Sequence, residues 1–161
     1  MSTATETSEA ERGAQWRTEG DWRAGVIGGV LGAAAMGVLV LAMNRATLAV
    51  AIPSLYGLAP PESVAAGLFV HISHGAVLGV VFAAIAAAVG AESSTETVGL
   101  GALWGVVAWV VLAALVMPVW LSMVGSPANP PFPNFAIPSL LWHLVYGVVL
   151  GAVYALVEGE I

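Results

Sequence analysis

Three histidines have the widest chemical range of any side chains in this chain, and all three lie in long apolar stretches. His71 and His74 are spaced as H-x2-H, and His143 lies far along the chain. Imidazole nitrogens bind divalent metals and haem iron. Cysteine is absent, so any metal would have histidine or oxygen ligands. The spacing therefore leaves open a divalent metal bound by His71, His74 and His143, or a b-type haem with axial histidines from two helices.

The stretch that begins at His71 is repeated at His143. A single shift along the chain aligns His71 with His143, Gly75 with Gly147, Gly79 with Gly151 and Phe82 with Tyr154. Positions i, i+4, i+8 and i+11 lie on one side of an α-helix. Glycines at every fourth position are typical of close contacts between membrane helices. We therefore expect Gly75, Gly79, Gly147 and Gly151 to pack against neighbouring helices.

The preceding apolar stretches match each other less closely. A shift one residue longer than the one that aligns His71 with His143 aligns Gly28 with Gly101 and Gly32 with Gly105. Together with the histidine stretches, this match predicts a helical hairpin that is used twice. An even number of spans in each unit would give a parallel repeat about an axis along the membrane normal.

Tyr146 corresponds to His74 in this repeat, so the sequence predicts a central group of His71, His74, His143 and Tyr146. We call these four residues the polar quartet. As a ligand site, the quartet would bind the haem or metal. As packing residues, its members would instead form hydrogen bonds between helices, and such bonds contribute about 0.6 kcal/mol each on average. No acidic residue lies near the middle of a predicted span to support a proton relay.

The elements that must position the quartet are four apolar helices. Stretches of about 20 apolar residues predict membrane spans at about 24–43, 62–91, 98–117 and 138–157. The fold class is therefore all-α: a transmembrane four-helix bundle of two repeated hairpins, forming one membrane domain over residues 24–158. Glu62 is expected in the first turn of the second helix, and Pro118 is expected to end the third. Residues 1–23 are predicted to be a disordered cytoplasmic tail.

Composition indicates an integral membrane protein in contact with the lipid bilayer. The chain of 161 residues is 59% hydrophobic and 9% charged, with a mean hydropathy of +0.92. A net charge of -6 argues against a nucleic-acid partner, and the excess of acidic residues resembles halophile composition. Three of the four arginines precede the first span, which predicts a multi-pass protein of the cell membrane with both termini cytoplasmic. Trp120 and Trp142 would then lie in an outer aromatic belt.

The paired H-x3-G-x3-G-x2-[FY] motifs resemble a group of small, four-span archaeal integral-membrane proteins of unknown function. The resemblance covers about residues 25–157 and implies the four-span architecture, without an activity or cofactor. The chain carries no phosphate loop, nucleophile elbow or kinase signature. We expect a non-enzymatic accessory or structural membrane component that acts in a homo-oligomer or larger membrane complex. The alternatives are a haem- or metal-binding redox protein, and a small oligomeric transporter or channel.

Overall fold

A computed structural model describes residues 20–160, and the regular secondary structure of these residues is entirely helical, without strands. Its elements are α2 (Trp22–Met43), η1 (Thr47–Ala51), α3 (Ile52–Ser54), α4 (Val64–Val89), α5 (Ser94–Ala108), η2 (Trp109–Val116), α6 (Met117–Met123) and α7 (Ile137–Val157). Of the predicted tail, residues 1–19 lie outside the described residues, and Trp22 and Arg23 already belong to α2. The predicted all-α class is confirmed.

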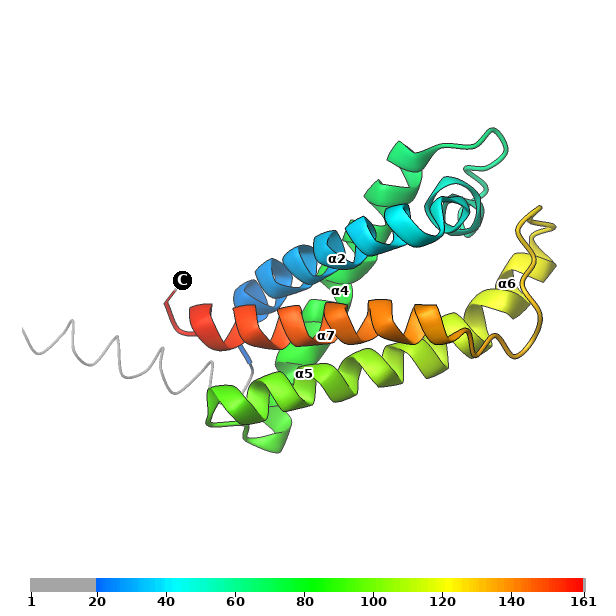
Figure 1. Cartoon of the computed structure of the whole chain (residues 1–161). Helices are drawn as coiled ribbons and strands as arrows, with labels where there is room; N and C mark the ends of the chain where they lie inside the picture. The colour runs from blue at the N-terminus through cyan, green and yellow to red at the C-terminus, as the bar shows by residue number, and fades with distance from the viewer. Residues whose placement is uncertain (1–19, 161) are drawn as a thin grey trace, which may run out of the picture.

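Four continuous helical stretches are long and apolar enough to span a bilayer: Trp22–Met43, Val64–Val89, Ser94–Met123 and Ile137–Val157. The third combines α5, η2 and α6, and we call it the third span. These four helices support the predicted membrane protein. The elements and their order along the chain can be followed in Figure 1.

Side-chain caps set the starts of three helices. Asp21 accepts hydrogen bonds from two backbone N–H groups at the start of α2, and Ser63 accepts one from Ala66 at the start of α4. At α5, Ser93 and Glu96 form a reciprocal capping box. The expectation that Glu62 lies in the first turn of a helix is wrong, because Ser63 caps α4 and Glu62 precedes that cap.

Glu62 instead faces Arg45 across the connection between the first two spans. The two side chains are 66% and 68% exposed and 4.0 Å apart, so the pair contributes little to stability. Arg45 lies just beyond the end of α2, which Asn44 caps.

The third span continues past Pro118, contrary to the prediction. Proline has no N–H to donate to the carbonyl one helical turn earlier, which here belongs to Ala114. The backbone of η2 is widened into π-helix, and the Asn134 N–H, from the loop after α6, donates to the Ala114 oxygen at 2.9 Å. Because another segment satisfies this carbonyl, the helix does not have to stop before the proline.

The same arrangement occurs after the first span. Pro53 cannot donate to the carbonyl of Ala49, which lies in the short π-helical segment η1. The Ser63 N–H donates to that oxygen at 2.9 Å instead. Backbone hydrogen bonds thus join the helical segments around Pro53 and Pro118 to the loops that follow them, residues 55–63 and 124–136. We call this part of the molecule the loop end.

The helices do not form a closed ring. Helix α2 packs along α4 and α7, and α7 packs along α5, whereas α4 and α5 touch little although they are consecutive in the chain. In Figure 1, α4 and α5 meet at their turn near the left end and diverge toward the loop end. The space between α4 and the third span is therefore not filled by helix packing.

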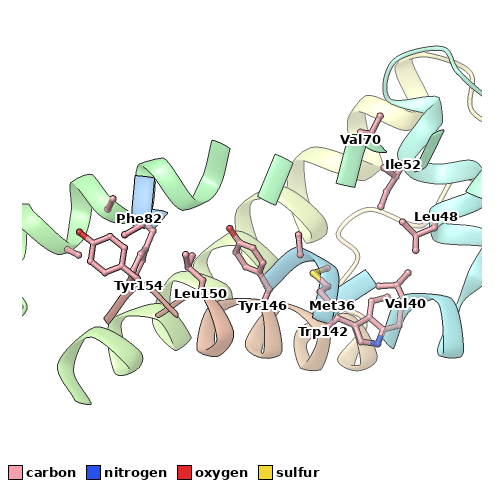
Figure 2. Packing of buried hydrophobic residues seen from close by; sticks show 14 residues of the cluster. Met36, Val40, Leu48, Ile52, Val70, Phe82, Trp142, Tyr146, Leu150 and Tyr154 are labelled. Atoms are coloured by element: carbon pink, nitrogen blue, oxygen red, sulfur yellow. The ribbon is translucent and has the colours of Figure 1, made fainter. Parts of the chain in front are cut away.

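A line of buried apolar side chains holds α2, α4 and α7 together. Figure 2 shows Phe82 against Tyr154 toward one end of the cluster, and Trp142 beside Val40 toward the other. The Phe82 and Tyr154 rings meet edge to face at 5.5 Å between centroids, a favoured aromatic geometry. Trp142 is buried, and its indole N–H points to the sulfur of Met43, so its predicted place in an aromatic belt is wrong.

Both described ends of the chain meet on the side opposite the loop end. The Asp21 N–H donates to the Tyr154 hydroxyl at 3.1 Å, and the Gly159 N–H donates to the Asp21 Oδ2 at 3.0 Å. We call this part the terminal end. An even number of spans places both ends on one side, and their cytoplasmic orientation stays a prediction.

Glu158, at the terminal end, gives the bundle a pH dependence. Burial raises the pKa of this carboxyl above its ordinary value, and the nearby Asp21 charge adds to the shift. A raised folded-state pKa means that the folded protein binds the proton more tightly. The resulting stability is fully present below the unfolded pKa of about 4.3 and is lost as pH rises through the folded pKa. We expect thermal unfolding in detergent to show this decline, and Glu158→Gln to flatten it; an unchanged profile in the variant would assign the decline to other groups.

Candidate functional site

A cavity of about 700 Å³ lies in the loop-end half of the bundle, between α4 and the third span. Elements from the whole described fold contribute to its wall: α2, η1, α3, α4, α5, η2, α6 and α7. Most lining side chains are apolar, including Met36, Leu78, Leu112, Val116 and Met117. The cavity occupies the space that the diverging α4 and α5 leave open.

All four members of the polar quartet line this cavity. His71 is 8% exposed and Tyr146 is 3% exposed, while His74 and His143 are half-buried. The structure therefore brings together, from α4 and α7, the residues that the sequence grouped by their spacing. Their chemical role depends on which nitrogen and oxygen atoms are already engaged.

His71 is held against α2. Its Nε2 lies 3.0 Å from the carbonyl oxygen of Ala33. A carbonyl only accepts, so Nε2 carries the hydrogen and donates. This bond fixes the tautomer of the neutral ring and leaves Nδ1 without the hydrogen.

His143 is held by its own helix. Its Nδ1 lies 2.7 Å from the Ser139 carbonyl oxygen and must donate to it, by the same reasoning. The neutral ring then has its lone pair on Nε2, at the far edge of the imidazole. His143 thus presents the opposite nitrogen from His71.

His74 has a partner that sequence reasoning missed. The Tyr56 hydroxyl lies 2.7 Å from His74 Nε2, and the two ring centroids are 5.6 Å apart. Tyr56 follows α3, in the proline-containing connection after the first span, and it also lines the cavity. The sequence gives little indication of this contact, because the position of a tyrosine in a loop does not show that it lies next to α4.

Tyr146 connects two pairs of closely packed helices, α2 with α4 and α5 with α7. Its hydroxyl donates to the carbonyl oxygen of Gly75 at 3.0 Å, and this bond is buried. The Gly75 carbonyl also belongs to the stripe of small residues on α4. A hydrogen bond between helices is the packing role that the sequence offered for the quartet, so the structure assigns that role to Tyr146.

The four predicted packing glycines do lie in helix contacts. A Cβ at Gly75 would overlap Ala33, and one at Gly79 would overlap the Gly25 carbonyl oxygen. A Cβ at Gly147 would overlap the Gly101 carbonyl oxygen, and one at Gly151 would lie 2.7 Å from the Thr97 oxygen. The first pair joins α4 to α2, and the second joins α7 to α5. In both pairs the backbones approach too closely for a larger side chain.

The contacts in the two helix pairs correspond under the same shift that aligns His71 with His143. Gly29 lies against Gly75 and Gly79, and Gly101 lies against Gly147 and Gly151. This shift also relates Gly29 to Gly101. The sequence match of the first and third helices pairs Gly28 with Gly101, whereas their helix contacts pair Gly29 with Gly101. The two alignments therefore differ by one residue.

The cavity wall contains no carboxylate from the described residues. Within residues 20–160, no three His, Asp or Glu side chains are grouped closely enough to hold a metal ion. Metal binding by His71, His74 and His143 therefore stays a prediction, without a three-ligand group among the described residues to support it. The described wall therefore offers the histidines no carboxylate with which to exchange a proton.

Comparisons with known proteins address the family of the chain. No curated protein and no solved structure matched it. The model of a family of unknown function, DUF6789, matches residues 20–160 and so covers all four spans and the cavity. The chain therefore belongs to this family of unknown function.

Proposed function

We propose that this protein is a non-enzymatic accessory component of the membrane that binds a small lipophilic molecule in the cavity. One observation carries the proposal: an apolar space of about 700 Å³ has the polar quartet converging on its wall. Ligand sites are commonly of this size, with apolar walls and a few placed polar groups. The polar groups here come from both helix pairs.

The edge of the cavity supports entry from the bilayer. Val77 on α4 and Val116 on η2 both line the cavity and are 63% and 49% exposed. They lie within two helices long enough to span the membrane, and those helices diverge here. An apolar, exposed rim within the spans suits a molecule that partitions into lipid.

The haem alternative is supported by one histidine and opposed by another. His143 donates its Nδ1 hydrogen to a carbonyl and leaves Nε2 free, as histidines that bind metals usually do. His71 uses Nε2 for the Ala33 carbonyl, so it would have to leave α2 to act as a second axial ligand through that atom. A Soret band in the purified protein would restore this alternative.

A duplicated hairpin is a further proposal about the origin of the site. The shift that the helix contacts share with the histidine stretches supports it, because two copies of one hairpin would repeat their helix contacts. It would also explain why histidine and tyrosine stand at corresponding positions of α4 and α7.

Filling the cavity tests the proposed binding. Ala113 lines the cavity, and Ala113→Phe is expected to occupy its space. We expect farnesyl methyl ether, an uncharged lipophile, to remain bound to the wild type in native mass spectrometry of the detergent-solubilised protein. The variant should lose at least about tenfold in affinity, since a buried ring would take the place of the ligand.

Ala84→Phe is the matched control, because Ala84 is exposed on α4 and does not line the cavity. It should bind the ether as the wild type does. Equal binding by Ala113→Phe and Ala84→Phe would contradict the cavity as the site.

A further inference from the structure

The free edge of His71 faces away from α2. A Cβ built on Gly37 of α2 would lie 3.5 Å from the ring Cδ2 and 3.8 Å from Nε2. The Cδ2–Nε2 edge therefore faces α2, where Nε2 also donates to Ala33. The Nδ1 atom is on the other side of the ring, and in the neutral tautomer it is an acceptor.

His143 supplies a second acceptor from another helix. Its Nδ1 hydrogen is committed to the Ser139 carbonyl, so the neutral ring accepts at Nε2. His71 and His143 both line the cavity, one from α4 and one from α7. The wall thus combines two imidazole lone pairs from different helices.

Three of the donors in the cavity wall are already engaged. The Tyr146 hydroxyl donates to the Gly75 carbonyl, and the Trp120 and Trp142 indole N–H groups point to the Leu55 carbonyl and the Met43 sulfur. Tyr56 and His74 bond to each other, and this bond uses one of the two polar hydrogens that the pair carries. The lone pairs on His71 Nδ1 and His143 Nε2 accept hydrogen bonds, so a ligand that donates one satisfies them, whereas a ligand whose only polar group is a carbonyl does not.

We propose that the ligand is an amphipathic alcohol or phenol whose hydroxyl donates a hydrogen bond to His71 Nδ1 or His143 Nε2. Its apolar body lies along Leu78, Leu112 and Val116 toward the bilayer. This inference rests on the proposed function and adds the chemical class of the ligand. A ketone, quinone or ether of the same size lacks the hydrogen that these two nitrogens require.

The test compares farnesol with farnesyl methyl ether, two ligands that share one apolar chain and differ in the hydroxyl hydrogen. We expect the wild type to bind farnesol about tenfold more tightly, as the gain of one buried hydrogen bond implies. His143→Phe should reduce this preference, because it removes one acceptor and leaves the ring volume. Ser73→Ala, which changes an exposed residue of α4 outside the cavity wall, should keep the preference.

The outcomes separate the two proposals. Equal binding of farnesol and the ether by the wild type, with both lost in Ala113→Phe, overturns the alcohol and keeps the cavity as a lipophile site. Tighter binding of the ether also overturns the alcohol. Failure of both ligands to bind overturns both proposals. The comparison on the wild type decides the ligand class even if His143→Phe does not fold.

Discussion

Gly75→Ala and Gly147→Ala are each expected to destabilise the protein by about 3 kcal/mol. The added methyl group at Gly75 would overlap Ala33 of α2, and the one at Gly147 would overlap the Gly101 carbonyl oxygen of α5. Lipid gives no hydrophobic drive for helix association, so close packing carries much of the stability. Unfolding in mixed micelles with increasing dodecyl sulfate measures the loss.

Gly99→Ala is the matched control for these two variants. Gly99 lies in α5, and a Cβ built there meets nothing within 4 Å. Alanine should therefore stabilise that helix by about 0.5–1 kcal/mol. If Gly75→Ala and Gly147→Ala behaved as Gly99→Ala does, the close glycine contacts would be wrong.

Asp21→Ala is expected to cost about 2 kcal/mol. The Asp21 Oδ1 accepts from the Arg23 and Ala24 N–H groups, and Oδ2 accepts from the Gly159 N–H. Removing the carboxylate leaves the start of α2 uncapped and also unties the end of the chain from it. The same unfolding measurement reports the change.

Asp21→Asn separates the cap from the tie to Gly159. Its amide oxygen keeps an acceptor for the α2 cap, while its NH2 group cannot accept from Gly159. We expect the stability of Asp21→Asn to lie between that of the wild type and that of Asp21→Ala. An Asp21→Asn variant as unstable as Asp21→Ala would show that the cap contributes little.

The glycine contacts and the cavity are two results of the same packing. Glycine stripes bring α4 close to α2, and α7 close to α5, while α2 and α7 join the pairs. No such stripe joins α4 to the third span within the described residues. Their divergence leaves the cavity at the loop end, with the histidines of α4 and α7 on its wall.

Helix boundaries at prolines were the least predictable part of the fold. Pro118 reads as a helix end because a helix normally cannot supply the N–H that proline lacks. The structure continues through it because Asn134, in the loop beyond α6, donates to the orphaned Ala114 carbonyl. A local pattern does not contain the position of such a distant donor.

The amino-acid sequence by itself determined the four spans, the packing glycines and the helix face shared by the quartet, since these follow from hydropathy and the helical period. Only the tertiary structure decided which atoms of that face are free. His71 donates to Ala33 on another helix, and Tyr146 donates to Gly75, so their roles depend on neighbours that periodicity does not identify. The cavity is likewise a property of the angle between α4 and the third span. Helical period fixes the direction of a side chain, whereas the packing of separate helices fixes what that side chain meets.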